Sequence, residues 1–363
     1  MRAVVYRGAN DLRVETVPVP SIRSGEVLVK VAVCGVCPTD IKKIHFGTVP
    51  PPRIFGHETA GTIVRVGAKV RRFKAGDRVA LHHHVPCGEC HACRHRAFAQ
   101  CEQYKRTGIT AGFEPAGGGY AEYVRVMDFV LPGVVKIPAG NSFLEGAMLE
   151  PVNTVLKAVK RLVLLPGDTV LVAGQGPIGL LFTRLLTLRA MKVLATDLWP
   201  SRLRAARDFG ALTPGDGLDD SVKQLTHGRG LDAAVIAVPL DEVVFQAQQL
   251  VRGGGQILLF SHTRRGSRTP LDLATICVDE KDFIGSYSAD YTLQNEVARL
   301  VFSRQLDTRR LVTHQLPLEQ TAAAVALASK PAADSLKVVV LASPEGAEPP
   351  AESRAPVTKR PVN

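Results

Sequence analysis

A glycine-rich turn between two apolar segments constrains the fold of this chain more than any other feature. The apolar segments, at 170–173 and 192–196, have the length and composition of buried strands. Between them lie Gly174-Gln175-Gly176-Pro177-Ile178-Gly179 and a helical pattern. Glycines at these spacings permit a tight turn, close approach of a pyrophosphate and close packing of a helix on a strand. Asp197 follows as an acceptor for ribose hydroxyls, so the stretch predicts a dinucleotide-binding strand–helix–strand unit.

The length and composition indicate a globular protein of two domains. The sequence has 363 residues, of which 45% are hydrophobic and 22% are charged. It contains neither an apolar stretch of membrane-spanning length nor a secretory signal pattern, so we expect a cytoplasmic protein with no membrane partner. The net charge of +11 favours anionic ligands, a dinucleotide among them. No basic block is interleaved with aromatic residues, so nucleic acid is not expected as a partner.

The pattern of expected strands and helices changes along the chain. Residues 1–150 contain short strand-like runs separated by proline-marked loops, and a helical pattern at 143–165 leads to the glycine-rich turn. Beyond the turn we expect strands at 231–238, 256–260 and 282–285 and helices at 201–209 and 242–251. This alternation predicts a parallel doubly wound sheet. The later segments do not continue it; these are helices at 293–304 and 318–329 and a strand at 336–341.

Four cysteines are crowded into one short segment. Cys87, Cys90, Cys93 and Cys101 have the spacing C-x2-C-x2-C-x7-C. Four thiolates on one loop can complete a tetrahedral Zn²⁺ shell with no open position, so we predict a structural zinc site. Disulfides are not expected in a cytosolic chain. We interpret the preceding run His82-His83-His84 as residues that do not bind the metal.

A second set of metal donors is dispersed along the chain. It consists of Cys37, His57, Glu58 and Glu150. One thiolate, one imidazole and carboxylates could leave a coordination position open for a substrate, as a catalytic zinc requires. Their spacing does not by itself bring them together, and a single Cys or His is more often part of a core than a ligand.

Six motifs along the chain resemble one enzyme family. In order they are GVCPTDIKK, GHETAGTIVRVG, GDRVALHHHVPCGECHACR, GGGYAEYV, LEPV and VLVAGQGPIGLL. Together they resemble the zinc-dependent medium-chain alcohol dehydrogenases over residues 1–342. The resemblance implies an α/β protein in which a GroES-like, β-rich catalytic domain at 1–153 holds two zincs. A Rossmann NAD-binding domain at 154–287 follows, 288–342 return to the catalytic domain, and 343–363 form a tail expected to be disordered.

The resemblance assigns roles to residues of the dispersed set. Cys37, His57 and Glu58 match the family's catalytic-zinc motif. Thr39 matches the residue that relays the substrate proton, and Asp40 matches the acid that orients the histidine ligand. Position 150 holds in this family either a third protein ligand or, in polyol dehydrogenases, a Glu that contacts the metal through water. Whether Glu58 or Glu150 binds the metal directly stays open.

The resemblance also assigns roles to the clustered cysteines and to the residues of the glycine-rich turn. The four clustered cysteines match the family's structural zinc ligands. The residues that match its cofactor-binding positions are Gly174, Gly176, Pro177, Ile178, Gly179, Asp197 and Arg202. The Asp197 carboxylate would repel a 2′-phosphate, so NAD is expected rather than NADP.

Some positions depart from the family pattern or are not used by it. Pro38 replaces the usual Gly or His beside the ligand cysteine, and Lys42 occupies a position where some relatives have a relay histidine. We interpret His45 as a surface histidine, and Cys34 and Cys277 as buried small hydrophobic residues.

The resemblance implies reversible oxidation of a secondary alcohol to a ketone, with hydride transfer to NAD. The strings CPTDIKK, HHHVPCGEC and LEPV are most similar to the sorbitol/L-iditol dehydrogenase branch, so a polyol is the expected substrate. L-threonine or a simple alcohol is the alternative. A non-catalytic NAD-binding regulator belongs to another class of function, and the retained zinc motif disfavours it. The family also implies a homo-oligomer, either a dimer or a tetramer.

Overall fold

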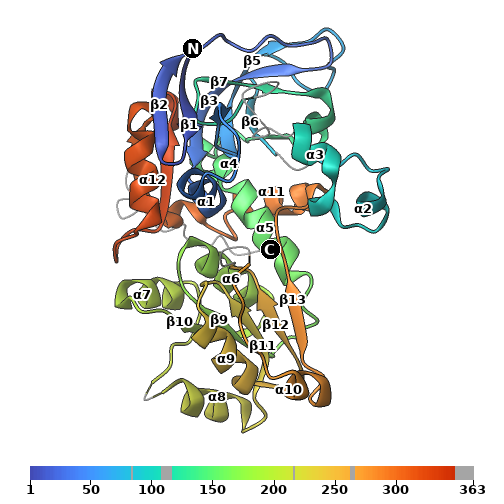
Figure 1. Cartoon of the computed structure of the whole chain (residues 1–363), viewed down its shortest axis with the longest axis vertical. Coiled ribbons are helices and arrows are strands. Elements are labelled where there is room, and N and C mark those ends of the chain that lie inside the picture. Colours follow the sequence, from blue (N-terminus) through green and yellow to red (C-terminus); the bar gives the residue numbers. More distant parts are fainter. Residues whose placement is uncertain (83–84, 108–116, 216, 262–265, 348–363) are drawn as a thin grey trace. The chain divides into compact units, whose positions relative to one another are not determined.

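The computed structural model describes residues 1–82, 85–107, 117–215, 217–261 and 266–347. Within these residues the chain forms two compact units (Figure 1). Unit 1 combines Met1–Asn153 with the segment that begins at Ala289, and unit 2 is Thr154–Ser288. None of the described helices is long and apolar enough to cross a membrane.

In the described part of unit 1, seven strands form one sheet. The strand order is β14-β15-β3-β5-β6-β8, and β7 also pairs with β3. The strands are β3 (Val27–Gly35), β5 (Glu58–Val66), β6 (Arg78–Ala80), β7 (Tyr123–Val126), β8 (Val135–Lys136), β14 (Val312–Pro317) and β15 (Lys337–Leu341). Every residue of β3 except Lys30 is buried, which explains its nearly continuous apolar sequence. The last strand, β15, lies between β3 and β14, so it completes the sheet from the far end of the sequence.

A smaller sheet packs into the same unit. It has the order β2-β1-β4, with β1 at Arg2–Gly8, β2 at Asp11–Thr16 and β4 at Arg53–Ile54. Tyr6 of β1 stacks edge-to-face on Phe55 with ring centroids 5.3 Å apart, and both are buried. The helices of this part of the sequence are α1 (Pro38–Phe46), α2 (His91–Arg94), α3 (Glu102–Thr107), α4 (Phe143–Ala147), α5 (Leu149–Val159), α11 (Gln294–Phe302) and α12 (Thr321–Ser329).

The single helix expected over 143–165 is instead two helices. α4 ends at Ala147, and α5 covers only Leu149–Val159. Pro151 has no N–H to donate to the carbonyl of Ala147, which explains why one continuous helix does not form.

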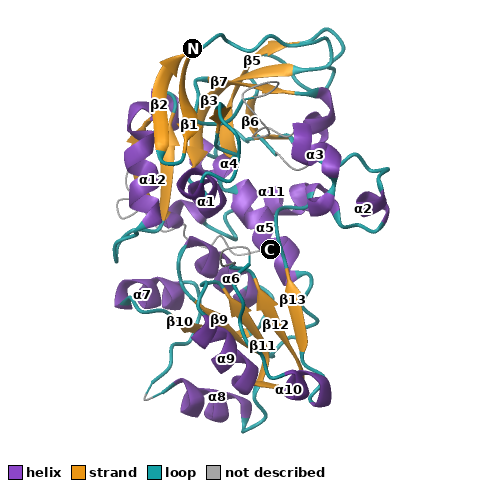
Figure 2. Cartoon of the chain, viewed as in Figure 1, coloured by secondary structure: helices purple, strands orange, loops and turns teal. Residues whose placement is uncertain are grey.

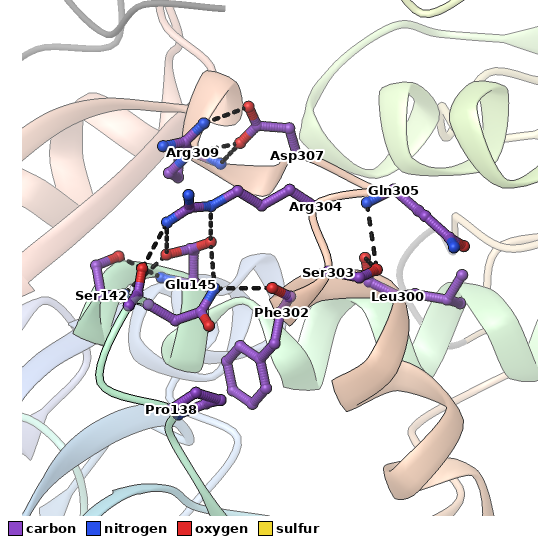
Figure 3. Close-up of polar contacts among 12 residues, drawn as sticks. Pro138, Ser142, Glu145, Leu300, Phe302, Ser303, Arg304, Gln305, Asp307 and Arg309 are labelled. Carbon is purple, nitrogen blue, oxygen red and sulfur yellow. Dashed lines mark hydrogen bonds and ion pairs between the residues drawn. The ribbon is translucent and has the colours of Figure 1, made fainter. Parts of the chain in front are cut away.

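A buried carboxylate fixes the segment after α11 onto α4 (Figure 3). Arg304 Nε donates to Glu145 Oε1 at 3.0 Å, and the Glu145 side chain is only 1% exposed. Asn141 Nδ2 donates to the same oxygen at 2.9 Å and to the Phe302 carbonyl at 3.1 Å. Glu145 and Ser142 also form a reciprocal capping box at the start of α4. The Glu145 side chain therefore both caps the start of α4 and binds the segment that follows α11.

Unit 2 is the expected doubly wound sheet. In its described residues five parallel strands have the order β10-β9-β11-β12-β13. They are β9 (Thr169–Ala173), β10 (Lys192–Thr196), β11 (Leu231–Ile236), β12 (Val251–Leu259) and β13 (Asp282–Gly285). The helices between them are α6 (Pro177–Thr187), α7 (Pro200–Asp208), α8 (Leu218–Thr226), α9 (Asp241–Leu250) and α10 (Leu273–Val278) (Figure 2). The predicted alternation of strand and helix is confirmed.

The first residues of the expected disordered tail are ordered. Ser343 and Gly346 are buried, and a short 3-10 turn covers Pro344–Gly346. A Cβ on Gly346 would lie 2.3 Å from the Ala32 carbonyl oxygen, so the glycine permits this close packing on β3. Glu345 also pairs with Lys30 at 3.1 Å. Residues 348–363 lie outside the described part of the chain.

Candidate metal and dinucleotide sites

Three of the dispersed donors meet where strands β3 and β5 pair. Glu58 begins β5 and lies opposite Gly35, the last residue of β3, in the antiparallel ladder. Cys37 follows as the N-cap of α1, and His57 immediately precedes β5. One potential ligand atom from each of Cys37, His57 and Glu58 lies within 4.8 Å of the others. The arrangement of a thiolate, an imidazole and a carboxylate suits a divalent zinc ion.

Asp40 orients the histidine of this set. Its Oδ2 lies 3.0 Å from His57 Nδ1 and also accepts the N–H of Gly56 at 3.2 Å. Nε2 is therefore the ring nitrogen that would bind a metal. Burial works against a charged imidazole, yet the negative charges of Asp40 and Cys37 hold the pKa of His57 well above its usual value. A metal that binds here would displace that proton, because only neutral imidazole is a ligand.

Lys337 is a component of this site that the sequence did not reveal. It is the first residue of β15, and its ammonium forms an ion pair with Glu58 in which the side chains are 6% and 3% exposed. Burial would lower the pKa of Lys337, but the charges of Glu58 and Cys37 raise it above its usual value. The only sequence signal is a charged residue at the head of the apolar run Lys337-Val338-Val339-Val340.

Glu150 lies outside the three-residue set. It is 6% exposed in the first turn of α5, and its charge contributes to raising the pKa of Lys337. Among the described residues, only Cys37, His57 and Glu58 contribute ligand atoms within the common 4.8 Å limit at this site. Thr39 is half-buried as the second residue of α1, two positions after Cys37.

The helix that carries Glu150 is anchored through Asn153. The Asn153 amide group donates to the Asp290 carbonyl and to Gln294 Oε1, both at 2.9 Å, and its carbonyl accepts the Asp290 N–H at 2.8 Å. Asn153 is completely buried. The chain that returns after unit 2 therefore fixes the start of α5.

The four clustered cysteines form a separate group. The Sγ atoms of Cys87 and Cys93 are 3.9 Å apart, those of Cys90 and Cys93 3.5 Å, and those of Cys87 and Cys101 3.7 Å. A zinc ion with Zn–S bonds of about 2.3 Å in a tetrahedron requires sulfurs about 3.8 Å apart. The four residues therefore fit a closed zinc shell. His82 is buried and is not part of this group, while His83 and His84 lie outside the described residues.

Backbone donors already favour a thiolate in this cluster. The N–H groups of Glu89 and Cys90 lower the pKa of Cys87 to about 7. Burial and the neighbouring thiols raise the pKa of Cys93 to about 12. The cluster thus holds thiol protons that a metal ion would release on binding.

The glycine-rich turn of unit 2 has the geometry that a pyrophosphate needs. Gly174 has φ +92°, a conformation that favours glycine. A Cβ on Gly179 would lie 1.7 Å from the Gly174 carbonyl oxygen, so helix and turn can pack only with glycine there. A Cβ on Gly176 would meet nothing within 4 Å, so this position faces open space. Pro177 begins α6, which leaves the N–H groups of its first turn, Ile178 included, for an anion.

Asp197 is fixed at the tip of β10 beside this turn. Its Oδ2 accepts the Gln175 N–H at 2.6 Å, and its Oδ1 accepts the Trp199 N–H at 2.9 Å. Arg202 lies 3.8 Å from the carboxylate, and the Asp197 side chain is 5% exposed. The arrangement joins the acid rigidly to the glycine turn.

Of the three residues that the family pattern does not use, two have the expected exposure and one does not. His45 is exposed, as expected, and its Nδ1 lies 3.1 Å from Asn10 Oδ1. Cys34 is fully buried, and burial raises its pKa to about 12. Cys277, however, is exposed rather than buried, because α10 buries none of its residues within this chain.

Comparisons with known proteins agree with this geometry. Residues 23–139 match the alcohol dehydrogenase GroES-like domain, and residues 177–303 match the zinc-binding dehydrogenase family. Sorbitol dehydrogenase from Bacillus subtilis (strain 168) is 33% identical, covering 94% of this chain and 97% of its own. Sorbitol dehydrogenase from Bombyx mori is 31% identical, covering 93% of this chain and 97% of its own.

Solved structures give the same result. An alcohol dehydrogenase from Thermotoga maritima superimposes with a TM-score of 0.86 at 25% identity, covering 94% of this chain and 98% of its own. A zinc-binding dehydrogenase from Sinorhizobium meliloti 1021 bound to NADP gives 0.83 at 27% identity, covering 94% and 98%. The GroES-like and Rossmann folds expected from the sequence are confirmed. The chain belongs to the zinc-dependent medium-chain alcohol dehydrogenases and is an oxidoreductase.

Proposed function

We propose that this dehydrogenase reversibly oxidises a secondary hydroxyl of a polyol to a ketone and transfers the hydride to NAD. The observation that carries the proposal is the set of Cys37, His57 and Glu58, whose ligand atoms lie within 4.8 Å of one another. The similarity to two sorbitol dehydrogenases over more than nine-tenths of the chain supports a polyol substrate.

In this proposal unit 1 carries out the chemistry. Cys37, His57 and Glu58 would hold the catalytic zinc, and Glu150 would act on it through water. When bound, the zinc supplies a Lewis acid that lowers the pKa of the alcohol hydroxyl. Asp40 keeps Nε2 of His57 directed at the metal by its 3.0 Å contact with Nδ1. Thr39, two residues after Cys37 on α1, accepts the hydroxyl proton and relays it to solvent.

A second zinc is proposed for the four cysteines. Their sulfur–sulfur distances of 3.5–3.9 Å allow all four thiolates to bind one zinc, which leaves no coordination position for a substrate. This zinc would therefore stabilise the segment that carries the cysteines and take no part in the reaction. The burial of Cys93 and Cys101 supports a structural role.

NAD is proposed as the cofactor of unit 2. The turn at Gly174, Gly176 and Gly179 with the start of α6 would bind the pyrophosphate, and Asp197 would accept the ribose hydroxyls. A 2′-phosphate at this carboxylate would be repelled, whereas Arg202 at 3.8 Å could soften that repulsion. Comparing reduction of NAD with that of NADP at equal concentration tests this preference.

The proposed function is tested by elemental analysis combined with NADH formation on sugar alcohols, threonine and simple alcohols. We expect two zincs per chain and turnover on a sugar alcohol. Cys37→Ser should retain one zinc and lose turnover, while Cys87→Ser should lose the other zinc. Turnover on threonine alone, or on simple alcohols alone, would mean that the substrate is that compound class and not a polyol. Binding of NAD without turnover on any of them would overturn the proposal in favour of a non-catalytic binder.

We also propose a cytoplasmic homo-oligomer, a dimer or a tetramer. On α10, Leu273 is 71% and Val278 is 80% exposed, an apolar surface that a second copy could cover. Seven free cysteines, five of which lie in groups with metal-site geometry, suit a reducing compartment. Light scattering of the purified chain would measure the oligomeric state, and a monomer would contradict the proposal.

A further inference from the structure

Lys337 presents a buried positive charge to a group of metal donors. Its Nζ forms an ion pair with Glu58 and donates to the Val36 carbonyl at 3.0 Å. The negative charges of Glu58, Cys37 and Glu150 all act on it. The metal cation itself neutralises the anionic ligands of a metal site, and a second cation beside the site repels the metal. This ammonium therefore requires an explanation beyond the packing of β15.

The absence of a side chain at Gly35 leaves the space that this ion pair occupies. β15 pairs with the end of β3 through Val339 and Gly35, and Gly35 also pairs with Glu58. A Cβ on Gly35 would lie 1.8 Å from Glu58 Oε2 and 3.0 Å from Lys337 Cε. The carboxylate and the lysine therefore meet across the one position of β3 that has no side chain. The Lys337 ammonium thereby holds Glu58 through Oε2.

We propose that Lys337 is a positioning residue, which holds Glu58 by one oxygen, weakens the site's affinity for its metal and keeps a coordination position open for the substrate. The inference rests on the proposed function, namely that Cys37, His57 and Glu58 bind zinc. Without the ammonium, Glu58 can turn both oxygens to the metal and close the site. The ammonium and the metal attract the same carboxylate, so each weakens the binding of the other.

The direction of the effect distinguishes this role from simple structural support. A residue that only supports the fold would, when removed, loosen the site and weaken zinc binding. Removal of Lys337 should instead strengthen zinc binding, because the metal-free site loses its compensating charge and the loaded site loses a repulsion. Coupling between two binding events in one protein is typically 5- to 150-fold in affinity, so we expect zinc to bind roughly tenfold more tightly.

The test measures zinc affinity of the purified full chain by chelator competition. Lys337→Met is compared with Lys337→Arg, which keeps the charge and should bind zinc like the parent. Lys281→Met is the matched control, because Lys281 is an equally buried lysine, 6% exposed and paired with Asp279 at 3.3 Å, in unit 2. It should leave zinc affinity unchanged. Cys37→Ser lacks one donor of the three-residue site, so its titration shows the zinc binding of the four-cysteine site alone.

Cobalt substitution gives a second readout that does not depend on activity. In Co²⁺-loaded parent chain, azide should enter the open position and shift the d–d absorption band, whereas Lys337→Met should show no shift. If Lys337→Met does not fold, Lys337→Gln, which retains a donor for the Val36 carbonyl, takes its place. Unchanged or weaker zinc binding in the folded variant would overturn the role of Lys337. A parent chain that binds only one zinc would instead overturn the proposed function.

Discussion

At the scale of single residues, the missing side chains of glycines shape both candidate sites. Gly35 lets Glu58 and Lys337 meet, and Gly179 lets α6 approach the turn at Gly174. Gly176 differs from both, because a methyl group there would meet no protein atom within 4 Å. The first two glycines are required by the packing of the protein itself, whereas the third is not.

This difference predicts that two alanine variants, both weaker in NAD binding, will differ in thermal stability. Gly179→Ala places a Cβ 1.7 Å from a carbonyl oxygen, so it should lower the Tm of unit 2 and abolish NAD binding with it. Gly176→Ala has a backbone that alanine can adopt, φ −67° and ψ −175°, and should keep the parent Tm while weakening NAD binding at least tenfold. Calorimetry and NAD titration measure both. Unchanged NAD affinity in Gly176→Ala would contradict the phosphate-binding role.

Local residue patterns could be predicted from the sequence, and contacts between distant segments could not. The cysteine cluster and the glycine turn each lie within one short segment, so spacing alone reveals them. Cys37, His57 and Glu58 needed the family resemblance, because only the pairing of β3 with β5 brings them together. Lys337 lies in a valine-rich strand with no motif, and only the position of β15 beside β3 gives it a role.

At the scale of elements, buried ion pairs join strands and helices that are distant in sequence. Arg125 of β7 donates to both carboxylate oxygens of Glu26 at 2.7 and 2.8 Å, just before β3 begins. Burial would raise the pKa of Glu26, but the hydrogen bonds from Arg125 and from the Arg23 N–H hold it below its usual value. The pair supports the β3–β7 ladder, which pairs Leu28 with Arg125.

The lowered pKa gives Glu26→Gln a pH-dependent effect on stability. A carboxyl whose pKa is lower in the folded state stabilises the fold above its unfolded pKa of about 4.3, and this contribution is lost as the pH falls through the folded value. We therefore expect a Tm several degrees below the parent at pH 7 and convergence of the two Tm values at acidic pH. Glu15→Gln breaks the exposed pair with Arg7 and should change the Tm little. A pH-independent difference would contradict the explanation.

The Glu145 network predicts how firmly the returning chain is held (Figure 3). Glu145→Ala removes the capping box and leaves Arg304 and Asn141 without their acceptor, so we expect a loss of about 2–4 kcal/mol in the free energy of unfolding. Glu145→Gln keeps an acceptor at this position and should lose less. Urea denaturation of the two variants measures the difference, and equal losses would mean that the ion pair contributes little.

At the scale of the whole molecule, the candidate sites for metal and cofactor lie in different units. Both candidate metal sites lie in unit 1, and the glycine turn lies in unit 2. A ligand stabilises the part of the protein that binds it, by about 2.7 kcal/mol at one hundred times its Kd. We therefore expect NAD to raise the Tm of one calorimetric transition and zinc chelation to lower that of another. A single transition moved equally by both treatments would contradict this division.

The position of β15 between β14 and β3 has a consequence for the order of events during synthesis. Residues 1–153 leave the ribosome long before Lys337–Leu341 exist, yet β3 needs that strand as its neighbour and Glu58 needs its lysine. Unit 2, whose strands are all contiguous in sequence, can fold while the chain is still being made. Until β15 is made, one edge of β3 in the nascent first segment is uncovered, and a chaperone bound at this edge would protect it from pairing with another chain.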